Sequence, residues 1–405
     1  MKILLINNIH FQKGGADAVY FNTARLLEQT GHEVLFFSAQ HINNVPYEHS
    51  EYFVTYRDYR LLSFIGKIKA ISSFIYNREA YRKLLSFVDE FKPDVAHIHL
   101  FLGGLSTSIL QALKKRNIPV VFSVHDYRLI CPAYLFLNGK NKICEQCIDQ
   151  FYLRCMLKRC SEKKLFQSVM LSLEAYFRKY FLNPLNYIDI FIFVSFFIHD
   201  KHIEFNPAYK HKAKTLYNFI PNLNMIEPIE SKREYFLYYG RLSKEKGVQF
   251  LIEVSDEVAL PLKIVGTGLL SGQFKNRTFR HIEFLGYKTG EELWNLVRNA
   301  SFIIVPSEWY ENNPLTIIEA YAHGRPVIGA RIGGIPEIVE HGKTGFLFDS
   351  GNKEQLKNAL TAASQLTETQ YKEMSKNARQ FANNHFSPDL HSQSLMNIYN
   401  EMIHY

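Results

Sequence analysis

The feature that most constrains the fold is an alternation of short apolar runs with longer amphipathic segments along the chain. Such a pattern is typical of parallel strands joined by crossover helices, because these strands are buried on both faces. In the first half, strands are expected at 1–7, 33–38, 94–100, 119–125 and 188–195. Helices are expected between them at 17–30, 63–91 and 104–116. We therefore predict an α/β domain with a mostly parallel sheet.

The pattern restarts after the turn-rich segment 217–222, which predicts a second domain. Its strands are expected at 235–240, 262–265, 282–286, 302–306, 326–330 and 345–348, and its helices at 245–258, 289–299, 314–323 and 352–385. A chain of 405 residues with 47% apolar side chains can form two cores. We place the domains at 1–220 and 221–387, followed by a helix at 388–405. Doubly wound domains bind ligands at the carboxyl ends of their strands.

Two carboxylates, Glu311 and Glu319, stand on either side of a Pro turn and the start of a predicted helix. Their spacing is about two helical turns, so both side chains can point along one edge of the same element. The free N–H groups of the helix start between them favour a phosphate. This layout suits a sugar at one end, a ribose at the other and a diphosphate between them. The alternative for each glutamate is a solvated surface acid.

A turn with several cations follows the strand predicted at 235–240 and includes Arg241 and Lys246 just before Gly247. Arginine offers a fork of donors and lysine a point charge, so together they can neutralise a pyrophosphate. The alternative is a pair of ordinary exposed cations.

Two further glycine turns, Gly14-Gly15 and Gly266-Thr267-Gly268, each follow a predicted strand. Glycine at such a place lets the backbone approach a ligand closely, although a glycine pair is often only a turn. His125 ends the strand at 119–125, where its side chain opens at the sheet edge and can bond to a sugar hydroxyl. The alternative for His125 is a structural hydrogen bond.

Together with Gly333-Gly334-Ile335-Pro336-Glu337 and the segment 341–347, these motifs resemble the retaining glycosyltransferases of family 4, the group 1 transferases. The resemblance extends to the first half through Gly14-Gly15, 31–34 and His125-Asp126, in the family's order. It implies the GT-B fold, in which two Rossmann-like domains face a central cleft. It also implies that the helix at 388–405 packs back on the N-terminal domain.

The resemblance further implies roles for single residues. The catalytic candidates are Glu311, next to the sugar, and His125, beside the transferred group. Glu319 would accept hydrogen bonds from the ribose. The residues implied to bind the donor are Gly15, Arg241, Lys246, Gly266, Gly268, Tyr287, Asn312, Asn313, Leu315 and Glu319. Asn-Pro stands at 313–314 where many members have Phe-Gly, which leaves the path of this loop open.

The implied reaction transfers a glycosyl group from a UDP- or GDP-sugar to an acceptor hydroxyl, with retention, during synthesis of a surface polysaccharide such as capsule, O-antigen or exopolysaccharide. The chain has no Asp-x-Asp motif placed to hold a metal at the donor phosphate, so no cofactor is expected for catalysis. Two alternatives stay open: a sugar-nucleotide epimerase or hydrolase on the same fold, and a non-catalytic sugar-nucleotide-binding scaffold.

The net charge of +8 is concentrated in two stretches, 57–83 and 151–181, each with seven Lys/Arg against two acids. Both interleave cations with apolar and aromatic residues, which favours the interface of an anionic membrane. A core-facing helix with a basic solvent face is the alternative. Nucleic acid is not expected, because no binding motif accompanies the charge.

The start of the chain, 1–7, is typical of a buried strand rather than a signal peptide, and no apolar run reaches eighteen residues. We therefore predict a cytoplasmic protein, peripheral on the inner face of the cell membrane, with a lipid-linked or oligosaccharide acceptor.

All five cysteines fall within thirty residues, in a segment at about 131–160 that resembles an insertion. They are Cys131, Cys144, Cys147, Cys155 and Cys160. Four of the five could hold a structural zinc, since a Cys-x-x-Cys pair with two later cysteines is compatible with a tetrahedral site. Free thiols, a disulfide and another metal are the alternatives.

Overall fold

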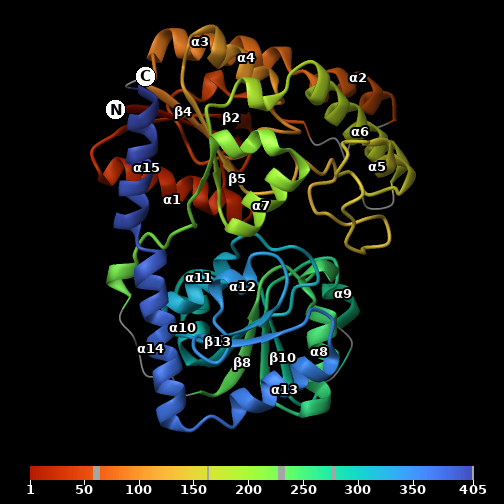
Figure 1. Ribbon diagram of the computed structural model, residues 1–405, viewed down its shortest axis with the longest axis vertical. Helices are drawn as coiled ribbons and strands as arrows, with labels where there is room; N and C mark the ends of the chain where they lie inside the picture. Colours follow the sequence, from red (N-terminus) through yellow and green to blue (C-terminus); the bar gives the residue numbers. More distant parts are fainter. Residues whose placement is uncertain (58–63, 162–163, 227–232, 275–276, 278, 404–405) are drawn as a thin grey trace. The chain divides into compact units, whose positions relative to one another are not determined.

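The computed structural model describes the chain except for residues 58–63, 162–163, 227–232, 275–276, 278 and 404–405. It divides into two compact units: unit 1 comprises 1–216 and 391–405, and unit 2 comprises 217–390. These divisions lie a few residues from the domain boundaries expected at 220 and 387. Each unit is a parallel sheet covered by helices on both faces (Figure 1).

The sheet of unit 1 has seven strands in the order β3-β2-β1-β4-β5-β6-β7. The strands are β1 (Lys2–Ile9), β2 (Glu33–Gln40), β3 (Val54–Thr55), β4 (Val95–Ile98), β5 (Val120–Val124), β6 (Ile190–Phe193) and β7 (Ala213–Thr215). The five predicted strands are all present. The edge strands β3 and β7 were not predicted, because runs of two and three residues are too short to show a hydrophobic period.

The helices of unit 1 are α1 (Gly15–Gln29), α2 (Phe64–Ile75), α3 (Arg78–Phe91), α4 (Ser108–Lys115), α5 (Leu153–Leu157), α6 (Leu165–Tyr180), α7 (Phe196–Phe205) and most of α15 (Pro388–Ile403). The single helix predicted at 63–91 is wrong. The chain breaks at Asn77, whose side chain caps α3 by accepting from the N–H of Ala80 at 3.1 Å. Residues 58–63 of the first basic stretch lie outside the described residues.

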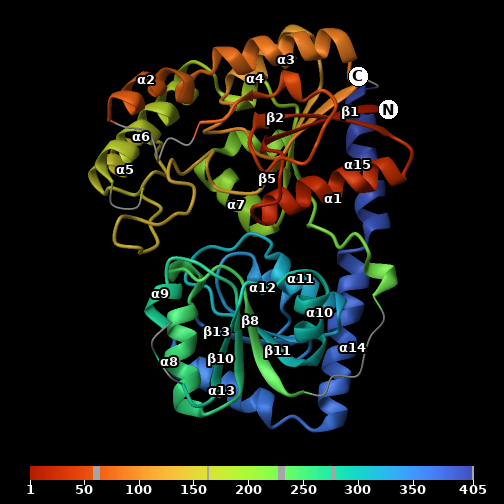
Figure 2. The same cartoon turned by 180° about the vertical axis from the view of Figure 1, so that it is seen from behind.

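One face of the unit 1 sheet is covered by α1 and α15, whose Tyr20, Leu27, Leu395 and Tyr399 share a core cluster with strand residues such as Leu5. Helices α3 and α4 pack against each other, and both views show them together on the opposite side of the sheet (Figures 1 and 2). The predicted return of the terminal helix to the N-terminal domain is therefore confirmed.

The sheet of unit 2 has six parallel strands in the order β10-β9-β8-β11-β12-β13, and all six were predicted. They are β8 (Tyr235–Tyr239), β9 (Leu262–Val265), β10 (Ile282–Gly286), β11 (Ala300–Val305), β12 (Val327–Ala330) and β13 (Gly345–Phe348). The helices are α8 (Val248–Val258), α9 (Ser271–Phe274), α10 (Gly290–Asn299), α11 (Leu315–Ala322), α12 (Ile335–Ile338), α13 (Lys353–Ser364) and α14 (Glu368–His385).

The single helix predicted at 352–385 is also wrong, because α14 begins anew at a capping box. The Thr367 hydroxyl accepts from the N–H of Gln370 at 3.3 Å, and the Gln370 side chain accepts from the N–H of Thr367 at 3.0 Å.

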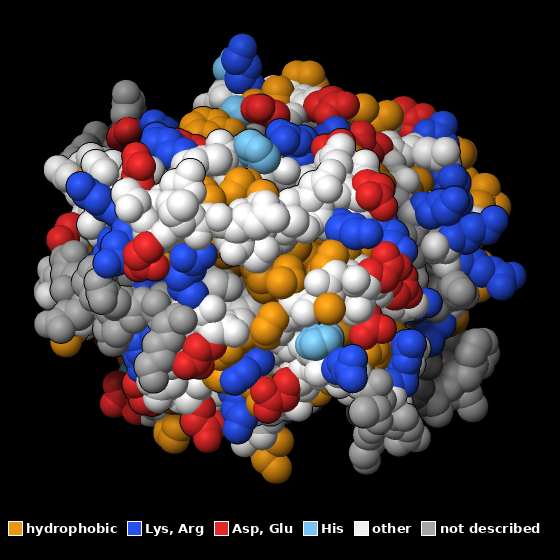
Figure 3. Space-filling model, turned by 90° about the horizontal axis from the view of Figure 1, so that it is seen from below, with side chains coloured by type: hydrophobic (Ala, Val, Ile, Leu, Met, Phe, Trp, Pro, Cys, Tyr) orange, Lys and Arg blue, Asp and Glu red, His pale blue; other side chains and the backbone are white. Residues whose placement is uncertain are grey.

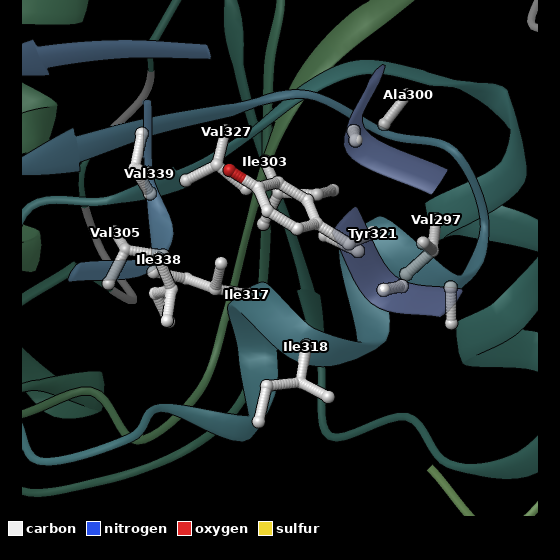
Figure 4. Close-up of a cluster of buried hydrophobic side chains, with 14 of the residues drawn as sticks. Val297, Ala300, Ile303, Val305, Ile317, Ile318, Tyr321, Val327, Ile338 and Val339 are labelled. Carbon is white, nitrogen blue, oxygen red and sulfur yellow. The ribbon is translucent and has the colours of Figure 1, made fainter. Parts of the chain in front are cut away.

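Alternate residues of β8 point to opposite faces of the sheet, as a strand requires. Leu237 belongs to the core cluster shared with α11, α12 and α14, whereas Phe236 belongs to the cluster shared with α8 and α13. In the first cluster the ring of Tyr321 lies among aliphatic side chains (Figure 4). Its hydroxyl donates to Thr344 Oγ1 at 2.6 Å, which satisfies the one polar atom of this buried side chain.

On one face of the protein, positively and negatively charged side chains are mixed. Figure 3 shows a face on which cationic and anionic side chains are interspersed around small apolar areas. Among the described residues, none of the helices combines the length and the apolar content that crossing a membrane requires.

Candidate functional site

The turns that follow β8, β9 and β10 are bonded to one another at the carboxyl edge of the unit 2 sheet. The N–H of Gly266 donates to the carbonyl of Gly286 at 2.7 Å, and a Cβ on Gly266 would lie 1.9 Å from the carbonyl oxygen of Gly240. A Cβ on Gly268 would lie 2.3 Å from the carbonyl oxygen of Leu242. Gly266 and Gly268 are therefore required by the packing of this edge, whether or not a donor also contacts them.

Lys246 is positioned by the glycine that follows it. Gly247 has φ +67°, and a Cβ there would lie 1.8 Å from the carbonyl oxygen of Pro306. Only glycine allows this approach. It places the turn after β8 directly against the end of β11, from which the loop carrying Glu311 departs.

Glu311 is buried and accepts three hydrogen bonds on one carboxylate oxygen. Its Oε1 lies 2.7 Å from Lys246 Nζ, 2.7 Å from Ser307 Oγ and 2.9 Å from Trp309 Nε1. Burial raises the pKa of Glu311, but the Lys246 ammonium and these donors outweigh burial and leave the pKa below its ordinary value. The residue is thus a buried carboxylate with its charge balanced. The N–H of Gly334, from the predicted Gly-Gly motif, donates to the Glu311 carbonyl at 2.7 Å.

Glu319 lies on α11 and is only partly buried. Its Oε2 accepts from the Tyr239 hydroxyl at 3.1 Å, and that hydroxyl also lies 2.9 Å from the carbonyl of Thr316. Burial raises the pKa of Glu319 to about 7, against the lowering effect of the Tyr239 bond. Among the described residues, Glu311 has an ion pair with Lys246 whereas no ion pair joins Glu319 to a cation, so the effect of burial on the pKa of Glu319 is not offset by a positive charge.

Arg241 does not join the Glu311 cluster. Its side chain is 59% exposed and pairs with Glu245 at 2.7 Å. The structure therefore brings one of the two predicted phosphate-binding cations, Lys246, to the buried carboxylate, and leaves the other on the surface of the same turn.

The loop ahead of α11 is fixed by the segment that opens unit 2. Asn313 is buried, its side-chain oxygen accepts from the N–H of Asn218 at 2.8 Å, and its carbonyl accepts from the Asn218 side chain at 3.2 Å. Leu315 begins α11, as predicted, and Asn312 lies beside Glu311 in the chain. Tyr287 is 71% exposed and follows β10.

In unit 1, three histidines lie in a row behind the edge where β5 ends. His125 Nε2 lies 3.0 Å from His99 Nδ1, and the rings of His99 and His97 are stacked at 4.6 Å. His97 completes the row by bonding to the Tyr399 hydroxyl at 2.6 Å and to Ser123 Oγ at 2.8 Å. The terminal helix therefore supports the residue predicted to lie beside the sugar through two intervening rings.

All three imidazoles are neutral at physiological pH. Burial lowers the pKa of His125 to about 4 and that of His97 to about 3. It lowers the pKa of His99 well below the ordinary value, with help from the neighbouring His97 and His125. A neutral row can donate or accept hydrogen bonds without attracting an anion.

Sequence reasoning found His125 but missed His97 and His99. The signal was present, because residues two apart on a strand project from the same face. The segment 94–100 contains histidine at 97 and at 99, next to the strand that carries Ser123 and precedes His125.

Gly14 and Gly15 form the exposed start of α1. The loop is held by buried Asp17, which accepts from the N–H of Gly14 at 3.0 Å and from Asn7 Nδ2 at 2.9 Å. The predicted glycine turn is therefore an ordered helix start at the carboxyl end of β1.

The cysteines lie in a loop-rich lobe between β5 and α6 and form no disulfide. A hydrogen bond between the thiols of Cys155 and Cys160 raises the pKa of Cys155 and lowers that of Cys160. Burial raises the pKa of Cys131 and of Cys147 to about 12. The described residues contain no group of three or more His, Cys, Asp or Glu side chains placed to hold a metal ion. The zinc site expected from the spacing of the cysteines stays a prediction.

The comparisons with known proteins agree with this architecture. A family model described as Glycosyltransferase Family 4 matches residues 13–221, which is more than half of the chain. A second model, described as Glycosyl transferases group 1, matches residues 220–381. The chain belongs to glycosyltransferase family 4. It is a group 1 glycosyltransferase, as the motifs predicted.

Two relatives have descriptions that mention a cps region and colanic acid biosynthesis. A protein of Klebsiella pneumoniae described as an uncharacterized 42.6 kDa protein in the cps region is 23% identical over 354 residues, covering 84% of this chain and 87% of the relative. The putative colanic acid biosynthesis glycosyltransferase WcaL of Escherichia coli is 27% identical over 174 residues, covering 39% of this chain and 43% of WcaL.

Solved structures show the GT-B fold. Sucrose-phosphate synthase from Thermosynechococcus elongatus has a TM-score of 0.72 at 18% identity, covering 99% of this glycosyltransferase and 98% of that chain. Anabaena HepE, solved in complex with UDP, has a TM-score of 0.63 at 18% identity, covering 99% and 100% of the two chains.

Proposed function

We propose that this glycosyltransferase moves a hexosyl group from a UDP- or GDP-sugar to a hydroxyl of a lipid-linked or oligosaccharide acceptor, with retention, in surface polysaccharide synthesis. The carrying observation is the ion pair between Lys246 and buried Glu311 at the carboxyl edge of the unit 2 sheet, at 2.7 Å. Lys246 has three donors and uses one on Glu311, so it can also bond to a diphosphate. HepE, with the same fold, was solved with UDP, which makes UDP-sugars the first donors to test.

The state of Glu311 favours a same-face route to retention over a route through a covalent intermediate. Its charge is balanced by Lys246 and its Oε1 already accepts three hydrogen bonds, which weakens it as a covalent nucleophile. We therefore propose a same-face substitution in which the leaving diphosphate accepts the proton of the acceptor hydroxyl. Lys246 and Arg241 would stabilise the leaving charge, which is the main electrostatic demand of the reaction. Arg241 would exchange Glu245 for the phosphate.

We propose metal independence at the donor on the same residues, since two cations and the start of α11 can supply the charge that a metal would otherwise bring. Turnover should survive treatment with EDTA. A loss that added Mg²⁺ or Mn²⁺ restores would contradict this part of the proposal.

The description of a relative and the charge of the two basic stretches support the proposed acceptor class and site of action. WcaL is described as a putative colanic acid biosynthesis glycosyltransferase, and the two basic stretches favour an anionic membrane surface. We propose that the protein works on the cytoplasmic face of the membrane, where lipid-linked acceptors are presented.

The deciding experiment mixes the purified protein with UDP-, GDP- and ADP-sugars, with and without a membrane extract, and measures nucleotide release. Release that requires the extract supports a transferase. Release without it indicates a hydrolase, and binding without release indicates a scaffold. The anomeric configuration of the product, read by NMR, tests retention.

Zinc in the cysteine lobe is a separate structural proposal. About one zinc per chain in elemental analysis, with thiols protected from titration, would support it. Freely titratable thiols in a protein without zinc would contradict it.

A further inference from the structure

The outward side of α6 carries an apolar stripe where a surface helix normally carries polar residues. The stripe consists of five residues at helical spacing, namely Leu165, Val169, Leu173, Tyr176 and Tyr180. None of them is buried, and Leu173 and Tyr180 are 47% and 67% exposed. The other side of the helix holds the buried residues, including Ala175. An apolar stripe on the outer side needs an explanation beyond packing.

The stripe continues onto α5 and the lobe before it. Helix α5 packs on α6, with the rings of Tyr152 and Tyr176 at 5.3 Å. Leu157 on α5 is 73% exposed, and Phe181 just after α6 is 71% exposed. Of the eighteen large apolar side chains exposed in the described part of the chain, nine fall between 143 and 181. Exposed apolar area is therefore concentrated in one short segment of unit 1.

Cations border this area. Arg154 lies over the Phe151 ring at 5.4 Å and Lys179 over the Tyr180 ring at 5.2 Å, while Arg159 is exposed. Cations beside exposed aromatic rings are typical of side chains at a membrane interface.

One cation of the stretch 151–181 is absent from the surface. Arg178 is buried, pairs with buried Glu174 at 3.0 Å and donates to the carbonyl of Leu129 at 2.9 Å. It fixes α6 to the loop after β5, and it contributes nothing to surface charge. The side of α6 that carries Glu174 and Arg178 therefore faces the core, which was the alternative to a membrane-facing helix, whereas the opposite side does not.

The two basic stretches meet in space although they are far apart in the sequence. Phe74 of α2 shares a core cluster with Met170 and Leu171 of α6. Both views show α2, α5 and α6 side by side at one end of unit 1 (Figures 1 and 2). Helices α2 and α6, one from each basic stretch, are therefore neighbours in unit 1.

We propose that this region, made of residues 143–157, the outer stripe of α6 and Phe181, docks unit 1 on an anionic lipid bilayer. The apolar side chains would enter the headgroup boundary and the surrounding cations would contact lipid phosphates. A second copy of the chain is a poorer fit, because a symmetric contact would bring the same cations face to face. The proposal rests on the proposed function only in assigning the acceptor to a lipid.

The test is flotation with phosphatidylcholine vesicles that contain or lack about a third phosphatidylglycerol, at low and high salt, since screening weakens surface attraction. Leu157→Asn with Leu173→Asn should weaken binding to the anionic vesicles about tenfold or more. Ile42→Asn with Val45→Asn is the matched control, because it also removes two exposed apolar side chains from unit 1.

Two charge-reversal variants, one in the proposed docking region and one outside it, test the role of the cations. Arg159→Glu with Lys164→Glu should also weaken binding about tenfold, whereas Lys114→Glu with Lys115→Glu changes net charge equally on exposed positions of α4 and should change binding less than twofold. Thermal unfolding confirms that each variant folds.

Three results would overturn the docking surface: wild-type protein that ignores anionic vesicles at low salt, patch and control variants that lose binding equally, or a dimer that only the patch variants dissociate. Nucleotide release from the donor in the presence of a membrane extract is measured in parallel. Docking without any release refutes the proposed sugar transfer alone. Release that requires the extract, without docking on vesicles, refutes the docking surface and the proposed membrane location but not the sugar transfer.

Discussion

Around the predicted catalytic residues, unit 2 keeps a buried side chain charged, whereas unit 1 keeps its buried side chains neutral. Glu311 stays ionised because Lys246 lies 2.7 Å away and two further donors point at the same oxygen. His125 stays neutral because burial lowers its pKa to about 4 and its ring partner, His99, is an uncharged imidazole.

The difference corresponds to the two halves of the proposed substrate pair. A diphosphate needs fixed positive charge balanced by a nearby carboxylate, since an isolated buried charge would be costly. A sugar hydroxyl needs donors and acceptors in defined places, which neutral imidazoles supply. We expect charge changes in unit 2 to alter donor affinity, and bond changes in unit 1 to alter turnover with little effect on donor affinity.

The largest effect is expected from Lys246→Ala. The variant loses a charge-assisted contact to the diphosphate, worth about 1.5–3 kcal/mol, or roughly 10- to 150-fold in donor affinity. It also leaves Glu311 buried without its cation, which should destabilise the fold by about 2–3 kcal/mol, below the range for fully buried pairs because Lys246 is 26% exposed. Donor titration and chemical denaturation measure the two losses separately.

The double variant Lys246→Ala with Glu311→Gln is the control. It removes both charges, so stability should largely return while donor affinity stays low. Unchanged donor affinity in Lys246→Ala would remove Lys246 from the phosphate site. Arg241→Ala should lower donor affinity with little loss of stability, because the Arg241 side chain in its ion pair with Glu245 is 59% exposed.

The candidate residues of unit 2 could be predicted from the sequence more completely than those of unit 1. The unit 2 residues lie in short contiguous motifs on turns after strands, so Lys246, Glu311 and Glu319 could be predicted. Two of the donors to Glu311, Ser307 and Trp309, could not be predicted. Their contact with Glu311 depends on the path of the loop between β11 and α11, which the unusual Asn-Pro at 313–314 leaves undetermined in the sequence. The histidine row draws on β4, β5 and α15, and Tyr399 reaches His97 across 302 positions. Such contacts depend on which strands pair and on where the terminal helix packs, and the local sequence pattern does not predict them.

His99→Phe should have the next largest effect. It removes the bond to His125 at 3.0 Å while keeping a ring in the buried row, so kcat should fall about tenfold with donor affinity unchanged. His99→Asn, whose amide reaches near the Nδ1 position, should restore part of the rate. Equal losses in both variants, or a loss of donor affinity, would mean that His99 acts on the fold of unit 1 and does not position His125.

The pH dependence of donor binding should separate the units as well. Glu319 has a pKa of about 7, so if its carboxylate form binds the ribose, about 10% of the protein is competent at pH 6 and about 90% at pH 8. Affinity for an intact UDP-sugar should therefore rise about tenfold between these pH values. Glu319→Gln should abolish the slope. The histidine row should add no step there, because burial lowers the pKa of His125 to about 4, that of His97 to about 3 and that of His99 well below its ordinary value.

The same pKa has a stability consequence with a defined sign. Because the folded-state pKa of Glu319, about 7, exceeds its ordinary value of 4.5, the folded protein holds this proton more tightly than the unfolded chain. The contribution to stability is therefore lost as pH rises from about 4.5 to about 7. Denaturation midpoints of the wild type and Glu319→Gln, compared across this range, should diverge if the assignment is right and stay parallel if it is wrong.

The smallest effect is expected from Tyr399→Phe, compared with Tyr239→Phe. Both remove a buried hydroxyl, but Tyr399 bonds to His97 at 2.6 Å and Tyr239 bonds to Glu319 at 3.1 Å. Tyr399→Phe should cost about 1 kcal/mol of unfolding free energy, because one neutral hydrogen bond is lost, and should leave the pH profile of donor binding unchanged. Tyr239→Phe should shift that profile to higher pH, because the Tyr239 bond lowers the pKa of Glu319. Denaturation and donor titration of both variants at pH 6, 7 and 8 decide the matter, and a shifted profile in Tyr399→Phe would show that the neutral row of unit 1 also influences the charged site of unit 2.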